Sequence, residues 1–405
     1  MSDGLLIVDK PLGVTSFDAV AAVRGALHTK KVGHAGTLDP MATGILVIGF
    51  GRATRLLQYI VEHDKTYEAT IRLGMRTTTD DAEGETIIDP EASARWSALS
   101  ERTVEPEPET EMDETDDSAQ AVASPTARAW RGLIERTIAE RFLGDIEQVP
   151  NTFSAIKING KRAYDLAREG RDVELRPRPV HIAEFSVLDV RPGRTSSALA
   201  GAPLVAVGEA DATIPVIDVD VRVSCSSGTY IRALARDLGE TLGVGGHLTR
   251  LRRTRVGRFC LPDDRSGLGT TVQAITAHTE QRTFTNREGE TITRARCVLD
   301  TPEELSGEER TDWLLARAVP MGDAARGAMP VIEISDAEAR ELRFGRRLER
   351  RLAGDVMQAA AIVPAEAGTS DQQSETRSGA QDDVVAIVER ANAHQIKPSV
   401  VFPAE

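Results

Sequence analysis

Apolar and polar residues alternate along the first part of the chain in patterns that predict both helices and strands. The segment 16–27, "SFDAVAAVRGAL", places apolar residues at helical spacing behind a Thr-Ser pair that can cap a helix. The run 44–51, "GILVIGFG", is short and continuously apolar, which is typical of a buried strand. In 65–74, "KTYEATIRLG", apolar residues alternate with polar ones, so we expect a half-buried strand.

The middle of the chain continues this mixture. Residues 127–144 read as an amphipathic helix, and 228–243 as a helix whose apolar face ends at Gly243. Between them, 181–190 and 216–225 are rich in β-branched residues and predict strands. The chain shows no internal repeat.

The pattern weakens after residue 262 and returns near the C-terminal end. Residues 279–294 predict a loop or hairpin excursion, and from about 329 short strand-like pieces surround one helix at 336–345. The chain has 405 residues, enough for two or three domains. We therefore expect a small β-rich domain at the C-terminal end.

The formal net charge of -14 is concentrated in two stretches. Residues 101–124 carry a net charge of -8 and residues 365–383 one of -4, so little remains for the rest of the chain. Both lack apolar periodicity and are interpreted as disordered acidic insertions. The net charge therefore does not exclude a nucleic-acid partner.

Two stretches concentrate basic residues. Residues 157–179 hold seven Lys or Arg against four acids, and residues 247–258 hold five Arg and no acid. Dense guanidinium suits phosphate, because each neutralised phosphate releases a counterion. A solvated, ion-paired face explains the first stretch equally well, whereas the second favours RNA or another polyanion.

Other features of the sequence restrict the classes of protein to which the chain can belong. Three widely spaced cysteines suggest neither a disulfide framework nor a zinc site. No signal peptide and no apolar run long enough for a bilayer is apparent, so we expect a cytoplasmic protein with no membrane association. No heptad pattern or obvious sticky edge is present, and a monomer without an obligate protein partner is expected.

One acidic residue, Asp39, stands in the glycine-rich segment "GHAGTLDPMATGILVIGFG". Asp before Pro often starts a turn, and that is the simplest interpretation. The neighbours favour a functional role, because Gly33 and Gly36 allow close backbone approach and Gly44 opens a buried strand. A lone carboxylate cannot perform two-acid glycoside hydrolysis, but it can act as a nucleophile or stabilise a cationic sugar carbon.

Six ordered motifs together resemble the bacterial tRNA pseudouridine synthase B (TruB) family. They are "DKPLGVTSFDAV", "GTLDPMATGIL", "KTYEATIRLGMRTTTDDAEGE", "SAIKINGKRAYDLAREG", "CSSGTYIRALARDLGETLG" and "HLTRLRRTRVGRF". They span about residues 1–98 and 130–260. The resemblance implies an isomerase that converts uridine to pseudouridine at position 55, in the T arm of tRNA, and that needs no cofactor and no metal.

The resemblance also implies a fold. We expect the α+β pseudouridine synthase fold, a mixed and largely antiparallel central sheet flanked by helices and loops, followed by a small β-rich PUA-like domain. The catalytic domain would cover 1–262 with an acidic insertion at about 101–124. A connecting segment would cover 263–328, and the PUA-like domain 329–405, with its own insertion at about 365–383.

Three residues match the family's chemistry. Asp39 in "GTLDP" matches the catalytic aspartate, which attacks C1′ or C6 or assists glycal formation, and the sequence leaves these routes open. Tyr67 in "KTYEA" matches a tyrosine that stacks on the target base and later assists proton removal. Arg232 in "GTYIR" matches an arginine that pairs with the aspartate and thereby favours the ionised acid.

Other matches concern the binding of the substrate. Leu251 matches an apolar residue that packs on the flipped base, His34 a histidine of the RNA-binding cleft, and Asp81 an acidic position that helps hold the site. Asn151 and Phe153 depart from the common pattern, and we expect both beside the RNA-binding surface. Within the two basic stretches, the expected RNA contacts are Lys157, Lys161, Arg162, Arg252 and Arg253.

Three alternatives compete with this interpretation. The chain could be the catalytic subunit of an RNA-guided pseudouridine synthase, although "KINGKRAYDLAREG" favours the bacterial type. It could be a non-catalytic tRNA-binding protein or folding chaperone. A phosphate-handling enzyme is the weakest alternative, because no Lys-Ser/Thr pair follows the glycines as a P-loop requires.

Overall fold

The computed structural model describes most of the chain as two compact units. The described residues are 3–87, 95–96, 124–151, 157–158, 161–162, 175–196, 213–286, 289–365 and 382–404. The predicted acidic insertions lie almost wholly outside them. Unit 1 comprises Met1–His63 and Thr254–Glu405, and unit 2 comprises Asp64–Arg253. These units are defined by compactness, whereas the predicted domain boundaries at 262 and 328 come from the sequence. Those domain boundaries therefore stay a prediction.

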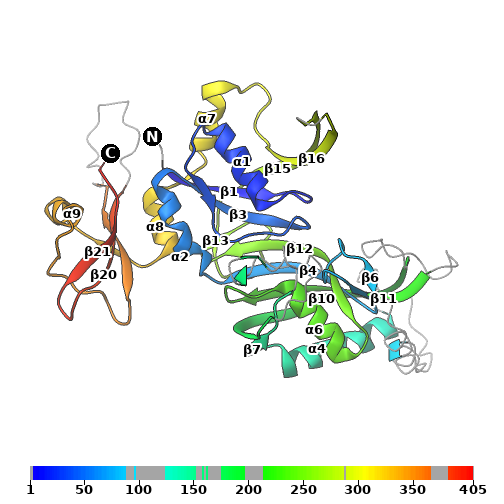
Figure 1. Cartoon of the computed structure of the whole chain (residues 1–405). Coiled ribbons are helices and arrows are strands. Elements are labelled where there is room, and N and C mark those ends of the chain that lie inside the picture. The colour runs from blue at the N-terminus through cyan, green and yellow to red at the C-terminus, as the bar shows by residue number, and fades with distance from the viewer. Residues whose placement is uncertain are drawn as a thin grey trace, which may run out of the picture. The chain divides into compact units, whose positions relative to one another are not determined.

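Unit 1 is built on a mixed sheet with the strand order β16-β15-β1-β3 (Figure 1). β1 is parallel to β15 and antiparallel to β3. Short strands extend the sheet, since β2 pairs with β3 and β17 with β1. The strands are β1 (Gly4–Lys10), β2 (Val32–His34), β3 (Ala42–Phe50), β13 (Phe259–Cys260), β14 (Thr270–Thr271), β15 (Ile275–Thr285), β16 (Thr291–Leu299) and β17 (Val319–Pro320).

The first helix of unit 1, α1 (Ser16–Ala26), forms where the spacing predicts it. The hydroxyl of Thr15 caps the backbone N–H of Asp18, and the Asp18 carboxylate accepts from the N–H of Thr15. The other helices are η1 (Gly51–Arg55), α2 (Leu57–Val61), α7 (Gly307–Leu315) and α8 (Met321–Ala328).

The C-terminal part of unit 1 is a four-stranded sheet with the order β18-β19-β20-β21 and one helix, α9 (Asp336–Arg343). This confirms the predicted small β-rich region. The strands are β18 (Val331–Glu333), β19 (Gln358–Val363), β20 (Asp383–Arg390) and β21 (Ile396–Val401). One apolar cluster includes Ile7 and Val47 of the first sheet together with Ile387 of this one and Phe402, which follows β21.

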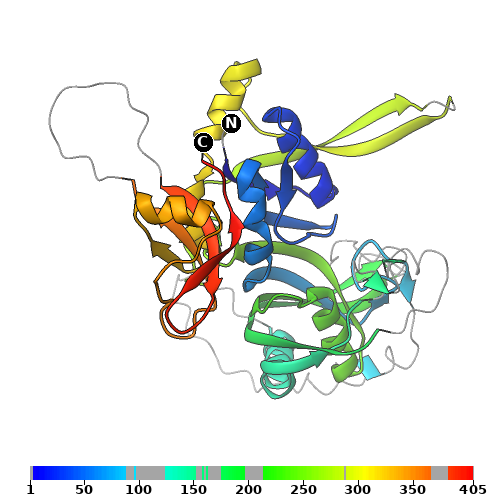
Figure 2. The same cartoon turned by 60° about the vertical axis from the view of Figure 1, so that its left-hand side comes forward.

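Unit 2 contains a second run of strands in the order β12-β4-β11-β10-β7, with two helices side by side against it (Figures 1 and 2). The strands are β4 (Lys65–Leu73), β7 (Gly144–Gln148), β10 (Arg178–Ser196), β11 (Thr213–Cys225) and β12 (Gly246–Val256), whose last residues belong to unit 1. The helices are α4 (Pro125–Arg141) and α6 (Ile231–Leu242). Both helices and the strands at 181–190 and 216–225 are confirmed, and α6 ends at Gly243 in the left-handed conformation.

Smaller pairs complete unit 2. β5 (Arg76–Thr77) pairs with β6 (Thr86–Ile87), and β8 (Lys157–Ile158) with β9 (Lys161–Arg162).

The prediction that β4 is half-buried is wrong. Its polar positions are also covered, since Thr66, Thr70 and Arg72 are each less than 7% exposed. These side chains find partners in neighbouring strands. Thr66 shares a hydrogen bond with Ser224, and the Arg72 guanidinium binds Asp218 through two nitrogens at 2.7 and 2.8 Å. The alternating sequence therefore belongs to a strand with both faces buried. One face is apolar, and the polar side chains of the other face bind residues of neighbouring strands.

The region of weak pattern forms regular structure. Within 263–328, β15 and β17 both pair with β1, and 279–294 forms most of the β15–β16 hairpin. This hairpin is largely exposed, which explains why its sequence shows no strong apolar periodicity. None of the helices in the described residues combines the length and hydropathy that crossing a bilayer would require.

Candidate active site

Asp39 lies in the loop that joins β2 to β3, at the closed end of a short antiparallel hairpin. His34 pairs with Ile48, and the chain then turns through Gly36, which has a φ of +87°. The Asp39 side chain is half-buried, and its carbonyl accepts from the Ala42 N–H at 3.0 Å. The carboxylate is therefore presented immediately before a strand that is buried along almost its whole length.

A serine from α1 holds this loop by its backbone. The Ser16 hydroxyl accepts from the Leu38 N–H at 2.8 Å and donates to the Leu38 carbonyl at 3.1 Å. Ser16 is 2% exposed, so both bonds are shielded from water. They fix the residue before Asp39 without using the Asp39 side chain.

A buried lysine closes the other side of the loop. Lys10, the last residue of β1, is fully buried and donates to the carbonyls of Pro11 and Val14 at 2.8 and 2.7 Å. It also lies 3.5 Å from the carbonyl of Pro40, which follows Asp39. The sequence analysis missed Lys10 and Ser16. A charged residue ending the apolar run "LLIVDK" was the available signal, because a buried ammonium must satisfy its donors.

The second group of predicted residues lies in unit 2. Tyr67 stands on β4 opposite Val223 and is 8% exposed, and Leu251 stands on β12 and is 6% exposed. Both side chains are mainly buried. This burial fits a packing role in the core as well as the lining of a site, so their predicted roles stay predictions.

Arg232, near the start of α6, is paired with a carboxylate. One guanidinium nitrogen lies 3.1 Å from Asp81 and donates to the Thr79 carbonyl at 3.0 Å. The two side chains are 7% and 4% exposed, so this is a buried ion pair. The Asp81 carboxylate also accepts from the Glu83 N–H at 3.0 Å and from the Thr79 hydroxyl.

This pairing joins two residues that the sequence analysis treated separately. Asp81 was expected to help hold the site, and its contact with Arg232 is a direct way to do so. The expected pairing of Arg232 with Asp39 joins residues of different units and stays a prediction.

A second buried cluster beside Arg232 was missed. Asp80 has a φ of +59° and accepts hydrogen bonds from Asn151 and Arg236. Burial raises the pKa of Asp80 despite the opposing charge of Arg236. Asn151 is 1% exposed and its amide donates to Asp80, so it is not itself a surface residue, and its expected place beside the RNA-binding surface stays a prediction. Phe153 lies outside the described residues.

The residues expected to contact RNA fall into two groups. Lys157, Lys161 and Arg162 lie on the β8–β9 pair, where Lys157 is opposite Arg162, and their side chains lie outside the described part. Arg252 is half-buried, whereas Arg253 is 1% exposed. A side chain so covered offers no surface to a phosphate, and we withdraw that role for Arg253.

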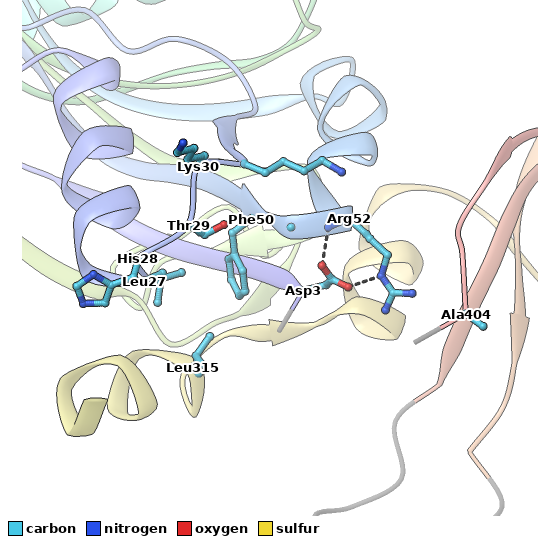
Figure 3. Close-up of a pocket in the computed structure, with 11 residues that line it drawn as sticks. Asp3, Leu27, His28, Thr29, Lys30, Phe50, Arg52, Leu315 and Ala404 are labelled. Atoms are coloured by element: carbon cyan, nitrogen blue, oxygen red, sulfur yellow. Dashed lines mark hydrogen bonds and ion pairs between the residues drawn. The ribbon is translucent and has the colours of Figure 1, made fainter. Parts of the chain in front are cut away.

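A pocket of about 880 Å³ lies at the opposite end of the β2–β3 hairpin from Asp39 (Figure 3). Residues before β2 and at the end of β3 line it, among them Lys30, Lys31 and Phe50. Asp3 binds both the backbone N–H and the guanidinium of Arg52 at its wall. None of the predicted site residues lines this pocket.

Comparison with known families identifies relatives along most of the chain. Residues 24–110 and 103–231 match the TruB family pseudouridylate synthase N-terminal domain, and residues 232–292 match the tRNA pseudouridylate synthase B C-terminal domain. The tRNA pseudouridine synthase B of Bifidobacterium longum (strain NCC 2705) is 63% identical over 99% of this chain and 98% of that protein. The same enzyme of Arthrobacter sp. (strain FB24) is 41% identical over 99% and 97%.

Solved structures show the same fold at greater distance. An H/ACA RNP bound to a substrate RNA containing 2′-deoxyuridine matches with a TM-score of 0.51 and 20% identity, over 99% of this chain and 85% of that one. A Cbf5-Nop10-Gar1 complex matches equally well, at 21% identity. The expected mixed α+β synthase fold is therefore confirmed.

Proposed function

The chain belongs to the TruB family of tRNA pseudouridine synthases, which makes it an isomerase of tRNA uridine, and we propose that Asp39 carries the reaction. The substrate is the uridine at position 55, in the T arm of tRNA. The observation that carries this proposal is the Asp39 loop itself, since Ser16 and Lys10 fix its backbone at the end of a buried strand. A preorganised carboxylate loses little motion when the substrate arrives.

The reaction exchanges one glycosidic bond for another. The C1′–N1 bond breaks, the base turns, and a C1′–C5 bond forms. The proton on C5 leaves and N1 gains one, so the product is an isomer of the substrate. An ionised Asp39 can serve by attacking C1′, by attacking C6 or by assisting glycal formation, and these three routes stay open.

We assign the remaining roles to buried residues of unit 2 and to one residue of unit 1. We assign to Arg232 the stabilisation of the ionised aspartate, and to Asp81 the positioning of Arg232, with which it forms the buried ion pair. Tyr67 would stack on the target base and later assist removal of the C5 proton. Leu251 would pack against the base, and His34 lies five residues before Asp39, where the nucleotide would enter.

The substrate must change shape before it reacts. A uridine stacked in the T loop hides C1′ and C5, so it must be drawn out of the stack at a cost of a few kcal/mol. Stacking on Tyr67 would recover about 1–3 kcal/mol of this cost. We assign phosphate contacts to Arg252 and to the β8–β9 segment with Lys157, Lys161 and Arg162, because guanidinium and ammonium groups bind the RNA backbone.

Tritium release from 5-³H-uridine tests the proposal. Wild-type protein should release tritium from a T-arm stem-loop in the absence of any guide RNA, and Asp39→Asn should release none above background. Asp189→Asn, an equivalent change in an exposed ion pair of unit 2, should leave release unchanged. Wild-type release only with a guide RNA would support the RNA-guided alternative, and full activity of Asp39→Asn would support a role for another residue.

The remaining expectations concern the oligomeric state and the location of the protein. We propose that the protein acts on tRNA as a monomer in the cytoplasm. A non-catalytic tRNA chaperone would bind the T arm equally well with or without the Asp39→Asn substitution and would release no tritium in either case, so the same assay separates the two functions.

A further inference from the structure

The β15–β16 hairpin extends away from the rest of unit 1 (Figure 2). Its register is regular from Ala277 opposite Leu299 to Thr285 opposite Thr291. From Gln281 to Thr285 every residue of β15 is exposed or nearly so. A two-stranded ribbon with both faces in solvent buries too little apolar area to be maintained for stability alone. Its surface chemistry therefore indicates what it contacts.

One face of this ribbon carries all of its charged side chains in the paired region. Successive residues of a strand point to opposite faces, so His278, Glu280, Arg282 and Phe284 share a face. The residues opposite them on β16 are, in the same order, Val298, Arg296, Arg294 and Ile292. The other face is lined by threonines, alanines and a glutamine, with Cys297 and Leu299 at its base.

The charges near the base of this face are neutralised. Glu280 binds the guanidinium of Arg296 at 2.5 and 3.0 Å, and His278 binds Asp300 at 2.6 Å. These contacts raise the pKa of His278 and lower that of Glu280. The base of the face therefore forms a self-contained ionic network.

Further out, the face is cationic. Arg282 lies directly opposite Arg294, and within the described part of the chain neither has an ion pair with an acid. Glu290, the next described acid towards the tip, accepts from the Asn286 amide at 2.9 Å. Like charges directly opposite on paired strands are destabilising. Beside them the ring of Phe284 is 38% exposed, with the Arg294 guanidinium 5.9 Å from its centroid.

The ribbon starts beside the Asp39 loop. β15 runs parallel to β1, and its Thr279 hydroxyl donates to the Leu12 carbonyl at 2.6 Å. The next residue, Gly13, donates its N–H to the carbonyl of Pro40 at 2.8 Å. Arg282 lies six residues beyond Thr276, which pairs with Asp9, so it reaches about 20 Å further in the direction of β1.

We propose that the Arg282–Arg294–Phe284 face of this ribbon binds the sugar–phosphate backbone of the tRNA substrate, outside the nucleotide that reaches Asp39. The inference rests on the proposed function, because the same RNA must occupy the Asp39 loop. Two cross-strand guanidiniums can share one phosphate, which relieves their mutual repulsion. The exposed ring next to them offers a stacking surface for an unpaired base.

Filter binding with full-length tRNA tests the inference, with every variant in an Asp39→Asn background to prevent turnover. Arg282→Ala and Arg294→Ala each remove one charge, and so does Arg296→Ala, the matched control on the same face. We expect the double variant Arg282→Ala/Arg294→Ala to bind about tenfold more weakly near 0.1 M salt. The slope of log affinity against log salt should fall by about one per arginine. Arg296→Ala should stay within about twofold of its parent, because its charge is already neutralised by Glu280.

Equal affinities and equal salt slopes for the double variant and its parent would overturn the inference. Weakening by Arg296→Ala as large as by Arg282→Ala would also overturn it, because a general loss of charge would then explain the effect. A face that instead binds an acidic protein would give this same negative result with tRNA.

A second assay separates this inference from the proposed function. The double variant with Asp39 intact should release tritium from full-length tRNA with a raised KM, and its thermal midpoint should match that of wild type, which shows that it is folded. If wild type itself releases none, the proposed function fails. If wild type is active and the double variant binds tRNA normally, only the role of the ribbon fails.

Discussion

Unit 2 and the β15–β16 ribbon use arginine in opposite ways. In unit 2, Arg72, Arg232 and Arg253 are at most 6% exposed, and the first two bind buried carboxylates. On the ribbon, Arg282 and Arg294 are exposed and face each other. The density of arginine in a sequence therefore does not reveal which cations meet a ligand. The neighbours in the folded sheet decide this.

The two regions differ because β4 lies inside a sheet, whereas the described outer part of the ribbon has only two strands. β4 pairs with β11 along its whole length, so a cationic side chain on β4 is covered by its neighbours. A covered cation needs a carboxylate or another acceptor beside it, because an unpaired buried charge is costly. The described part of the ribbon has only two strands beyond its base, so its cations keep their hydration until a partner arrives. Water solvates an exposed guanidinium at little cost.

The largest expected effect is on stability, and it separates a buried from an exposed arginine pair within unit 2. Asp218→Ala leaves the Arg72 guanidinium buried without its carboxylate, and we expect the free energy of unfolding to fall by about 3–5 kcal/mol. Glu135→Ala removes the partner of Arg131 from an exposed pair and should cost less than about 1 kcal/mol. Urea unfolding followed by tryptophan fluorescence measures both. Equal losses would contradict the distinction between buried and exposed pairs.

The next effect concerns catalysis through a buried pair. Asp81→Asn keeps the shape of the side chain but removes the charge that holds Arg232, and we expect kcat on a T-arm stem-loop to fall about tenfold or more with little change in KM. Glu240→Gln, in the exposed pair with Arg76, is the matched control. A change in KM alone would mean that Asp81 affects RNA binding instead of the reacting groups.

A smaller effect, on tRNA binding, distinguishes Arg252 from its neighbour Arg253 on β12. Arg252→Ala should weaken tRNA binding severalfold and lower the salt slope by about one, because this half-buried side chain can reach a phosphate. Arg253→Ala should leave the salt slope unchanged and lower the thermal midpoint instead, because its side chain is 1% exposed. A reversed result would place Arg253 at the RNA.

The smallest effect is a pH dependence at the base of the ribbon. The hydrogen bonds that the His278 ring donates to Asp300 and Glu280 raise the pKa of His278. A raised pKa in the folded state stabilises the fold below the unfolded value of about 6.5, and this contribution is lost as pH rises through the folded pKa. NMR titration of the His278 ring should show a midpoint above about 6.5. In Asp300→Asn the midpoint should move down, and no movement would exclude Asp300 as the cause.

Local pattern predicted much of this molecule. The α1 helix, the strand at 44–51, the helix ending at Gly243 and the C-terminal sheet all follow from spacing and capping residues that act within a few positions. The glycines and the proline around Asp39 made it a candidate, whereas its catalytic role came from the resemblance to the TruB family and stays a proposal.

The contacts that depend on distant residues could not be predicted. Lys10 lies near the Pro40 carbonyl only because β1 and β3 are paired, and Arg232 meets Asp81 across 151 positions of sequence. The cationic face of the ribbon appears only when the register sets Arg282 opposite Arg294. Sequence pattern carries the period of an element but not the identity of the residue across from it.

We propose that the Asp39 carboxylate, held in place by its loop, performs the isomerisation. The most direct test of this proposal is a single-turnover experiment with enzyme in excess over full-length tRNA labelled at uridine C5, comparing wild type with Asp39→Asn. The account predicts that both bind the tRNA with similar affinity, whereas only wild type forms pseudouridine. Pseudouridine formed by Asp39→Asn at the wild-type rate would contradict it.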